Sequence, residues 1–205
     1  MDFAKLLPLA FVMIAGPQIL TAIFLATTEK WRANSMALVA GAAISITAVA
    51  TIAYVLGAGA SNQGASNTTL NVIILVLLLA AALHTFLTRK TSKPPTWMGK
   101  LEGAEPSGSF KLGLLLLGIF PTDILTSIAV GGYAASHNES WRHILPFVLL
   151  TLLFLALPSL LIVLLGKRAE AFLPKVRDWM KSNSWIISEI VLALFIVLTV
   201  NSLAA

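Results

Sequence analysis

The sequence predicts an all-α membrane protein whose six transmembrane helices form two inverted three-helix repeats, and three observations lead to this fold class. Hydrophobic residues make up 58% of the 205 positions and charged residues only 11%, whereas about a quarter of residues are charged in soluble domains. Long apolar runs alternate with short polar segments, as expected for several membrane spans. One proline-containing motif occurs in both halves of the chain.

Six apolar runs are each long enough to cross a hydrocarbon core of about 30 Å as a helix. They extend over Leu6–Ala26, Ser35–Ala58, Leu70–Leu87, Phe110–Ala134, Ile144–Leu165 and Trp185–Leu203. We expect residues 1–87 to form the first repeat, residues 88–109 a cytoplasmic linker and residues 110–205 the second repeat. The first run is too long for a signal peptide and lacks a small-residue cleavage site, so we expect it to be retained.

The distribution of Lys and Arg predicts the orientation, because cytoplasmic loops retain positive charge during insertion. Only two of the 14 basic residues, Lys5 and Arg142, lie on one side of the predicted spans. The other side holds Lys30, Arg32, Arg89, Lys90, Lys93, Lys100, Lys111, Lys167, Arg168, Lys175, Arg177 and Lys181. We therefore expect a multi-pass protein of the cytoplasmic membrane with both termini outside. Basic residues that flank apolar runs do not indicate a nucleic-acid partner.

The repeated motif lies near the middle of the first and fourth spans. It reads PQILTAI from Pro17 and PTDILTSI from Pro121, with one extra residue in the second copy. Because three spans separate the copies, the two motifs must cross the membrane in opposite directions. Inverted repeats of this kind build transporters, in which discontinuous helices surround a binding site near the bilayer midplane.

The motif prolines predict a hinge in each of these spans, formed by Gly16 with Pro17 and by Pro121. A proline inside a helix removes one N–H donor and clashes with the carbonyl four residues earlier. In lipid the released backbone groups need partners, and nearby hydroxyls are candidates. Either proline alone fits an ordinary kink, whereas two prolines at matching depth favour a functional break.

Asp123 carries the predicted chemistry. A carboxylate near the centre of a membrane helix costs about 2.5 to 3.5 kcal/mol on insertion scales, so it usually faces a cavity, a partner or a substrate. Low dielectric favours the neutral form of a carboxyl group, which suits a residue that binds and releases a proton. The predicted substrate or proton pathway comprises Asp123, Gln18, Thr122, Thr21, Thr126 and Ser127.

Alternatives remain open for both central residues. Asp123 contacts a cationic group on the cargo, or it is a permanently protonated acid that hydrogen-bonds a carbonyl released near Pro121. Gln18, its counterpart in the first motif, either binds cargo or caps the broken helix.

Other functional signals are weaker. His84 and Glu189 each lie about one turn from the predicted cytoplasmic ends of spans three and six. They form a cytoplasmic gate, or they extend towards the interface or pair structurally. The sequence has no cysteine and no hydrolase or metal-ligand motif, so we expect no enzymatic activity, no metal and no cofactor.

Four short segments carry a family resemblance: Gly16–Leu20, Pro95–Met98, Gly113–Pro121 and Trp179–Asn183. On these residues the sequence resembles the GAP or Sap family of glycopeptidolipid- and sulfolipid-addressing proteins, within the lysine exporter (LysE) superfamily. The resemblance implies two inverted repeats, hinge prolines at Pro17 and Pro121, a homodimer, and outward movement of small solutes or envelope lipids. Amino-acid exporters of that superfamily carry Asn-Pro-Lys in the fourth span, whereas this chain has Pro121-Thr122-Asp123, which argues against an amino-acid cargo.

Two functions are compatible with these features. The first is a secondary exporter that interacts with membrane lipid and a small-molecule or lipid cargo. Its driving force is the proton gradient or the membrane potential, which is worth about 2.3 kcal/mol per charge per 100 mV. The second is a non-transporting accessory protein that scaffolds a lipid or glycolipid export complex through its basic cytoplasmic loops.

Overall fold

The computed structural model describes residues 3–14, 17–59, 101 and 103–183, with scattered positions between 76 and 87 and between 186 and 200. Within these residues the chain is helical and contains no strand. Its contacts divide it into two compact units, Met1–Asn62 with Thr96–Arg177, and Gln63–Pro95 with Asp178–Ala205. Each unit draws on both halves of the sequence, and the division into repeats over 1–87 and 110–205 stays a prediction.

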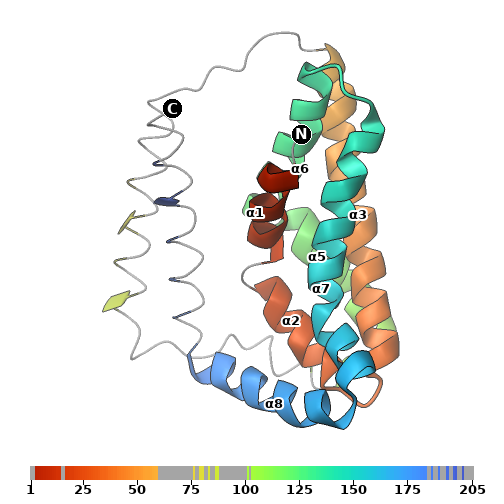
Figure 1. The fold of residues 1–205 in the computed structure, drawn as a ribbon, viewed down its shortest axis with the longest axis vertical. Helices are drawn as coiled ribbons and strands as arrows, with labels where there is room; N and C mark the ends of the chain where they lie inside the picture. The colour runs from red at the N-terminus through yellow and green to blue at the C-terminus, as the bar shows by residue number, and fades with distance from the viewer. Residues whose placement is uncertain are drawn as a thin grey trace. The chain divides into compact units, whose positions relative to one another are not determined.

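The first unit contains most of the described helices (Figure 1). These are α1 (Phe3–Ile14), α2 (Pro17–Ala26), α3 (Trp31–Gly59), α5 (Pro106–Ile119), α6 (Pro121–Ser136), the 3-10 helix η2 (Trp141–Ile144), α7 (Leu145–Leu165) and α8 (Lys167–Ser182), whose last turn belongs to the second unit.

In the described part of the chain, two helical stretches are long and apolar enough to cross a membrane, Trp31–Gly57 and Trp141–Leu165. A third is present if the bent pair Pro106–Ile119 and Asp123–Ser136 counts as one span. These three correspond to the predicted second, fifth and fourth spans. The predicted spans over Leu70–Leu87 and Trp185–Leu203 lie largely outside the described residues, so the total of six stays a prediction.

The helices extend beyond the predicted apolar runs at several points, of which two are larger or lie in the predicted linker. α3 begins at Trp31 rather than Ser35, and α5 begins at Pro106, inside the predicted linker. An apolar run marks only the part of a helix that matches the hydrocarbon core, whereas the hydrogen-bonded helix continues through the interface. Pro106 favours an earlier start, because proline at the first helical position has its φ preset and no N–H to satisfy.

The described helices α2 and α6 begin at the two motif prolines, Pro17 and Pro121, while a hinge function of these residues stays a prediction. α1 ends at Ile14 and α2 begins at Pro17, while α5 ends at Ile119 and α6 begins at Pro121. Between α5 and α6, Phe120 is extended, with φ −63° and ψ 125°, since a residue before proline is sterically excluded from the helical region. The helix axis bends by 65° across this break. The backbone at Gly16 lies outside the described residues.

Glycine residues allow α3 to pack very closely against α5 and α6. A Cβ atom added at Gly41 of α3 would lie 2.2 Å from the Phe110 carbonyl oxygen. Conversely, a Cβ at Gly113 of α5 would lie 2.1 Å from the Leu38 oxygen, and one at Gly131 of α6 would lie 2.2 Å from the Ala50 oxygen. Small residues at such contacts let helix backbones approach each other, which is how membrane helices gain van der Waals attraction without a hydrophobic driving force.

The packing partners of the two long helices differ in a regular way. α3 packs along α5 and α6, whereas α7 packs along α1 and α2, and α3 also contacts α7 and α2. Each long helix therefore covers both parts of one broken span. α1 also contacts α6, and α2 contacts α5.

α8 follows α7 after a sharp turn at Gly166, whose φ of +51° favours glycine. Ala169 and Leu173 of α8 are buried in a cluster with Ala26 of α2 and Ile162 of α7. This cluster holds α8 against the C-terminal end of α2.

Candidate functional site

The two helix breaks meet at a buried hydrogen bond between the central residues of the two motifs. Nε2 of Gln18, at the start of α2, donates to Oδ2 of Asp123, at the start of α6, over 2.5 Å. Gln18 is 2% exposed and Asp123 1% exposed. The structure therefore brings together the two residues that the sequence singled out, although they are separated by 105 positions.

A second contact shows that the broken spans cross in opposite directions. Ser127 Oγ of α6 lies 3.9 Å from Met13 Sδ of α1, in hydrogen-bond geometry. From Gln18 of α2 to Met13 of α1 the chain runs towards its N-terminus, while from Asp123 to Ser127 α6 runs towards its C-terminus. Figure 1 shows the same arrangement, with α1 above α2 and α6 above α5.

The site combines an apolar enclosure with groups that stabilise negative charge. Asp123 lies in the first turn of α6, where the helix dipole favours an anion by about 0.3 to 1 kcal/mol. The Gln18 amide donates to the same carboxyl group, and hydrogen bonds to charged groups contribute about 1.5 to 3 kcal/mol. Burial acts in the opposite sense, since it penalises the ionised form. Asp123 is therefore placed between groups that favour its ionised form and a burial that disfavours it.

Gln18 also has an acceptor that is not used in the described part of the chain. Its Oε1 is buried and makes no hydrogen bond to any described residue. A buried amide oxygen without a partner costs about 1 to 3 kcal/mol, so a hydrogen-bond donor supplied by water or cargo would be stabilised there.

The remaining pathway residues lie close to this pair in the sequence of each helix. Thr126 and Ser127 are buried on α6, three and four residues after Asp123, and therefore share its face of the helix. Thr21 is fully buried on α2, and its hydroxyl donates to the Pro17 carbonyl oxygen over 2.7 Å. Thr122 lies in the first turn of α6.

The predicted cytoplasmic gate is described in part. His84 lies outside the described residues. Glu189 is partly buried at a helical position, and its Oε1 makes no hydrogen bond within the described chain. Pairing between these two side chains stays a prediction.

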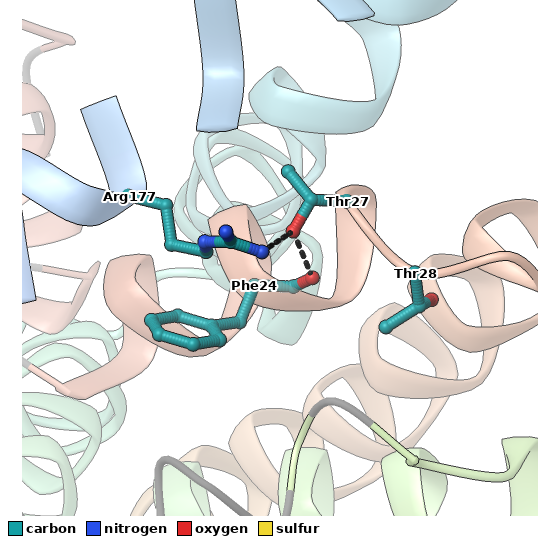
Figure 2. A pocket seen from close by; sticks show the side chains of 4 residues that line it. All are labelled: Phe24, Thr27, Thr28 and Arg177. Carbon is teal, nitrogen blue, oxygen red and sulfur yellow. Dashed lines mark hydrogen bonds between the residues drawn. The ribbon is translucent and has the colours of Figure 1, made fainter. Parts of the chain in front are cut away.

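A polar cavity at the other end of α2 was missed by sequence reasoning. It has a volume of about 290 Å³ and is lined by Phe24, Thr27, Thr28 and Arg177 (Figure 2). Arg177 is one of twelve basic residues on the predicted cytoplasmic side, and the positive-inside rule accounts for all of them equally. Nothing in the local sequence distinguishes Arg177 from the other basic residues, because its place at the cavity depends on the turn at Gly166 and on the packing of α8.

Among the described residues, no three His, Asp or Glu side chains are grouped so that they could hold a metal ion. The buried polar side chains of the described residues instead consist of one carboxyl, two amides (Gln18 and Asn34) and several hydroxyls. Such a set can exchange a proton and hydrogen-bond a ligand.

Comparison of the sequence with known protein families gives one match. A family model described as Sap, sulfolipid-1-addressing protein, matches residues 6–203. The chain belongs to the Sap family. No curated protein and no solved structure matches it.

The Sap match extends from α1 to beyond α8 and so includes both helix breaks and the Gln18–Asp123 pair. The resemblance to the Sap family that was inferred from the sequence is thereby confirmed, whereas membership of the LysE superfamily stays a prediction. The apolar helices and the Sap membership together make this chain a membrane protein.

Proposed function

We propose that this Sap family member is a secondary exporter of an envelope lipid or small solute in the cytoplasmic membrane, coupled to proton movement through Asp123. The observation that carries the proposal is the buried hydrogen bond between Gln18 and Asp123 at the meeting point of two broken, antiparallel spans. Broken helices that meet around a buried carboxyl group are characteristic of transporter sites. The name of the family model supports a lipid as the cargo.

The packing supports an inverted repeat with a two-fold axis close to this pair. In an inverted repeat, span one (α1 with α2) corresponds to span four (α5 with α6), and span two (α3) corresponds to span five (α7). The packing of α3 on α5 and α6 then has its counterpart in the packing of α7 on α1 and α2. Gln18 and Asp123 hold equivalent places in the two motifs, and they bond to each other. Equivalent residues meet in this way only near a symmetry axis. The proposal includes six spans, both termini outside, and membership of the LysE superfamily.

Gln18 can serve both protonation states of Asp123. An amide presents a donor on one side and an acceptor on the other. In the observed arrangement Nε2 donates to the carboxylate. After a half-turn of the amide, Oε1 would accept a hydrogen bond from the protonated acid. Proton binding at Asp123 would thus change the hydrogen-bond pattern between α2 and α6 without leaving the pair unbonded, and this links protonation to the arrangement of the broken spans.

Reconstitution tests the proposal. The purified chain is placed in vesicles of phosphatidylcholine and phosphatidylglycerol that contain a pH-sensitive dye. A panel of sulfated, phosphorylated and neutral short-chain glycolipids is then added under an imposed pH gradient. We expect at least one member to move across the bilayer ten times faster than in protein-free vesicles and to dissipate the gradient as it moves. If no member of the panel crosses the bilayer faster than in protein-free vesicles and none dissipates the gradient, the result would contradict the proposal and favour the accessory scaffold.

A further inference from the structure

The polar cavity at the C-terminal end of α2 is separate from the Gln18–Asp123 pair. It is lined by Phe24, Thr27, Thr28 and Arg177, whereas Gln18 lies at the start of the same helix. Nine residues of helix at 1.5 Å each place Thr27 about 14 Å along the axis from Gln18. By the predicted orientation this end of α2 faces the cytoplasm, where a cargo for export would first arrive.

Arg177 supplies the charge in this cavity. Its Nη1 donates to Thr27 Oγ1 over 3.3 Å, and its guanidinium lies above the Phe24 ring, 5.6 Å from the ring centre (Figure 2). A guanidinium has five N–H donors in a planar fork that matches the oxygen spacing of phosphate and sulfate groups. The contact with the ring and the bond to Thr27 hold the guanidinium beside the end of α2.

Two hydroxyls can join the guanidinium. Thr27 Oγ1 donates to the Phe24 carbonyl oxygen and Thr28 Oγ1 to the Leu25 carbonyl oxygen, each over 2.8 Å. The same two carbonyls also accept from the backbone N–H groups of Thr27 and Thr28, over 3.0 and 3.3 Å. Thr28 Oγ1 also accepts a hydrogen bond from Asn34 Nδ2 over 3.0 Å. This bond uses only a lone pair of the oxygen, so both hydroxyl hydrogens can turn towards a ligand without leaving a carbonyl unpaired. α3 begins three residues after Thr28, and the positive end of its dipole offsets the negative end of α2.

A second cavity, of about 230 Å³, shares Thr27 and Thr28 with the first. Its other walls are mostly apolar and include Trp31 of α3, Ile162 of α7 and Leu173 of α8. Glu29 and Glu170 also line it and are exposed. The apolar walls suit the hydrophobic part of an amphiphile, while the two carboxylates disfavour any further negative charge on that part.

We propose that Arg177, Thr27 and Thr28 bind the single tetrahedral oxyanion of a sulfate or phosphate ester on an amphiphilic cargo, with the apolar part of the cargo along Trp31 and Leu173. The inference deepens the proposed export function by naming the headgroup chemistry at the cytoplasmic entrance. The inference rests on the proposed export function in one respect, namely that the bound molecule is called a cargo. Binding itself depends on Arg177 and requires no transport.

A binding measurement in neutral detergent tests this site. The full-length chain is titrated with a short-chain sulfated glycolipid, with its desulfated analogue, and with inorganic sulfate and phosphate. We expect the sulfated lipid to bind at least ten times more tightly than the desulfated one and than either free ion. Equal affinity for inorganic sulfate would identify a free-anion site and overturn the assignment to an amphiphile.

Substitutions then locate the site. Arg177→Gln is expected to remove the preference for the sulfated lipid, and Arg177→Lys to retain part of it, because a lysine keeps the charge but not the planar fork. Arg168→Gln is the matched control, since Arg168 is exposed on the same helix and should leave affinity unchanged. Thr27→Val, which keeps the size of the side chain, is expected to weaken binding severalfold and covers the case in which Arg177→Gln fails to fold. Unchanged preference in Arg177→Gln or in Thr27→Val would overturn the proposal.

Asp123→Asn separates this inference from the proposed function. The substitution is expected to stop coupled export but to leave binding of the sulfated lipid intact, because the two sites lie at opposite ends of α2. Loss of binding in Asp123→Asn would show that the two sites are one, and it would contradict a separate headgroup site.

Discussion

Asp123→Asn is expected to reduce proton-coupled export to the level of protein-free vesicles, a loss of at least tenfold, while the protein remains folded. Asparagine has the size of aspartate and can still hydrogen-bond the Gln18 amide, so the packing of α2 against α6 should persist. It cannot bind or release a proton, however. The readout is the internal pH of reconstituted vesicles during movement of a glycolipid that the native protein exports.

Glu105→Gln provides the control for this substitution, because Glu105 is exposed before α5 and its surface ion pair with Lys30 contributes little, so export should stay unchanged. Asp123→Glu, which keeps the carboxyl group, is expected to restore part of the coupled flux. Export by Asp123→Asn at the native rate across the pH range would show that Asp123 serves structure alone.

Gly113→Ala should cause a large loss of stability for the addition of a single methyl group. The new Cβ would lie 2.1 Å from the Leu38 carbonyl oxygen, which belongs to the backbone of α3 and cannot move away cheaply. Overpacking of this kind costs about 1 to 3 kcal/mol, and the rigid neighbour places the expected value near the upper end. Thermal unfolding in detergent, followed by light scattering and helical circular dichroism, measures the loss.

Gly108→Ala is the matched control on the same helix. A Cβ added there meets no atom within 4 Å, and alanine has a higher helix propensity than glycine by up to about 1 kcal/mol. We therefore expect Gly108→Ala to be neutral or stabilising. Similar behaviour of the two variants would mean that α3 and α5 are not in the close contact that the structure shows.

Much of the central site could be predicted from the sequence, because proline has strong local consequences. α2 and α6 begin at Pro17 and Pro121, whereas Pro158 and Pro174 lie inside α7 and α8, so the paired motif rather than proline alone indicates these two positions. An acid next to such a break needs a partner, and the antiparallel crossing of the two motifs makes Gln18 the available one. Met13 could not be predicted, since an apolar residue in an apolar span carries no signal of its contact with Ser127.

Contacts that depend on tertiary packing were beyond sequence reasoning. The glycines of α3 and α5 indicate close approach, but a pattern of small residues does not show which helix is the partner. Helix ends were missed because hydropathy describes the hydrocarbon zone and not the hydrogen bonds that extend past it. The cavity at Arg177 depends on how α8 folds back after Gly166, which requires the three-dimensional path of the chain.

Site-directed labelling tests most directly the central claim, that the broken spans open a shared site alternately to the two sides of the membrane. The native chain has no cysteine, so Thr126→Cys introduces a single thiol at a buried position one turn from Asp123. We predict that membrane-impermeant thiol reagents modify it from either side, that pH changes the two labelling rates in opposite directions, and that Asp123→Asn removes this pH dependence. Labelling from neither side, or from one side only at every pH, would contradict the account.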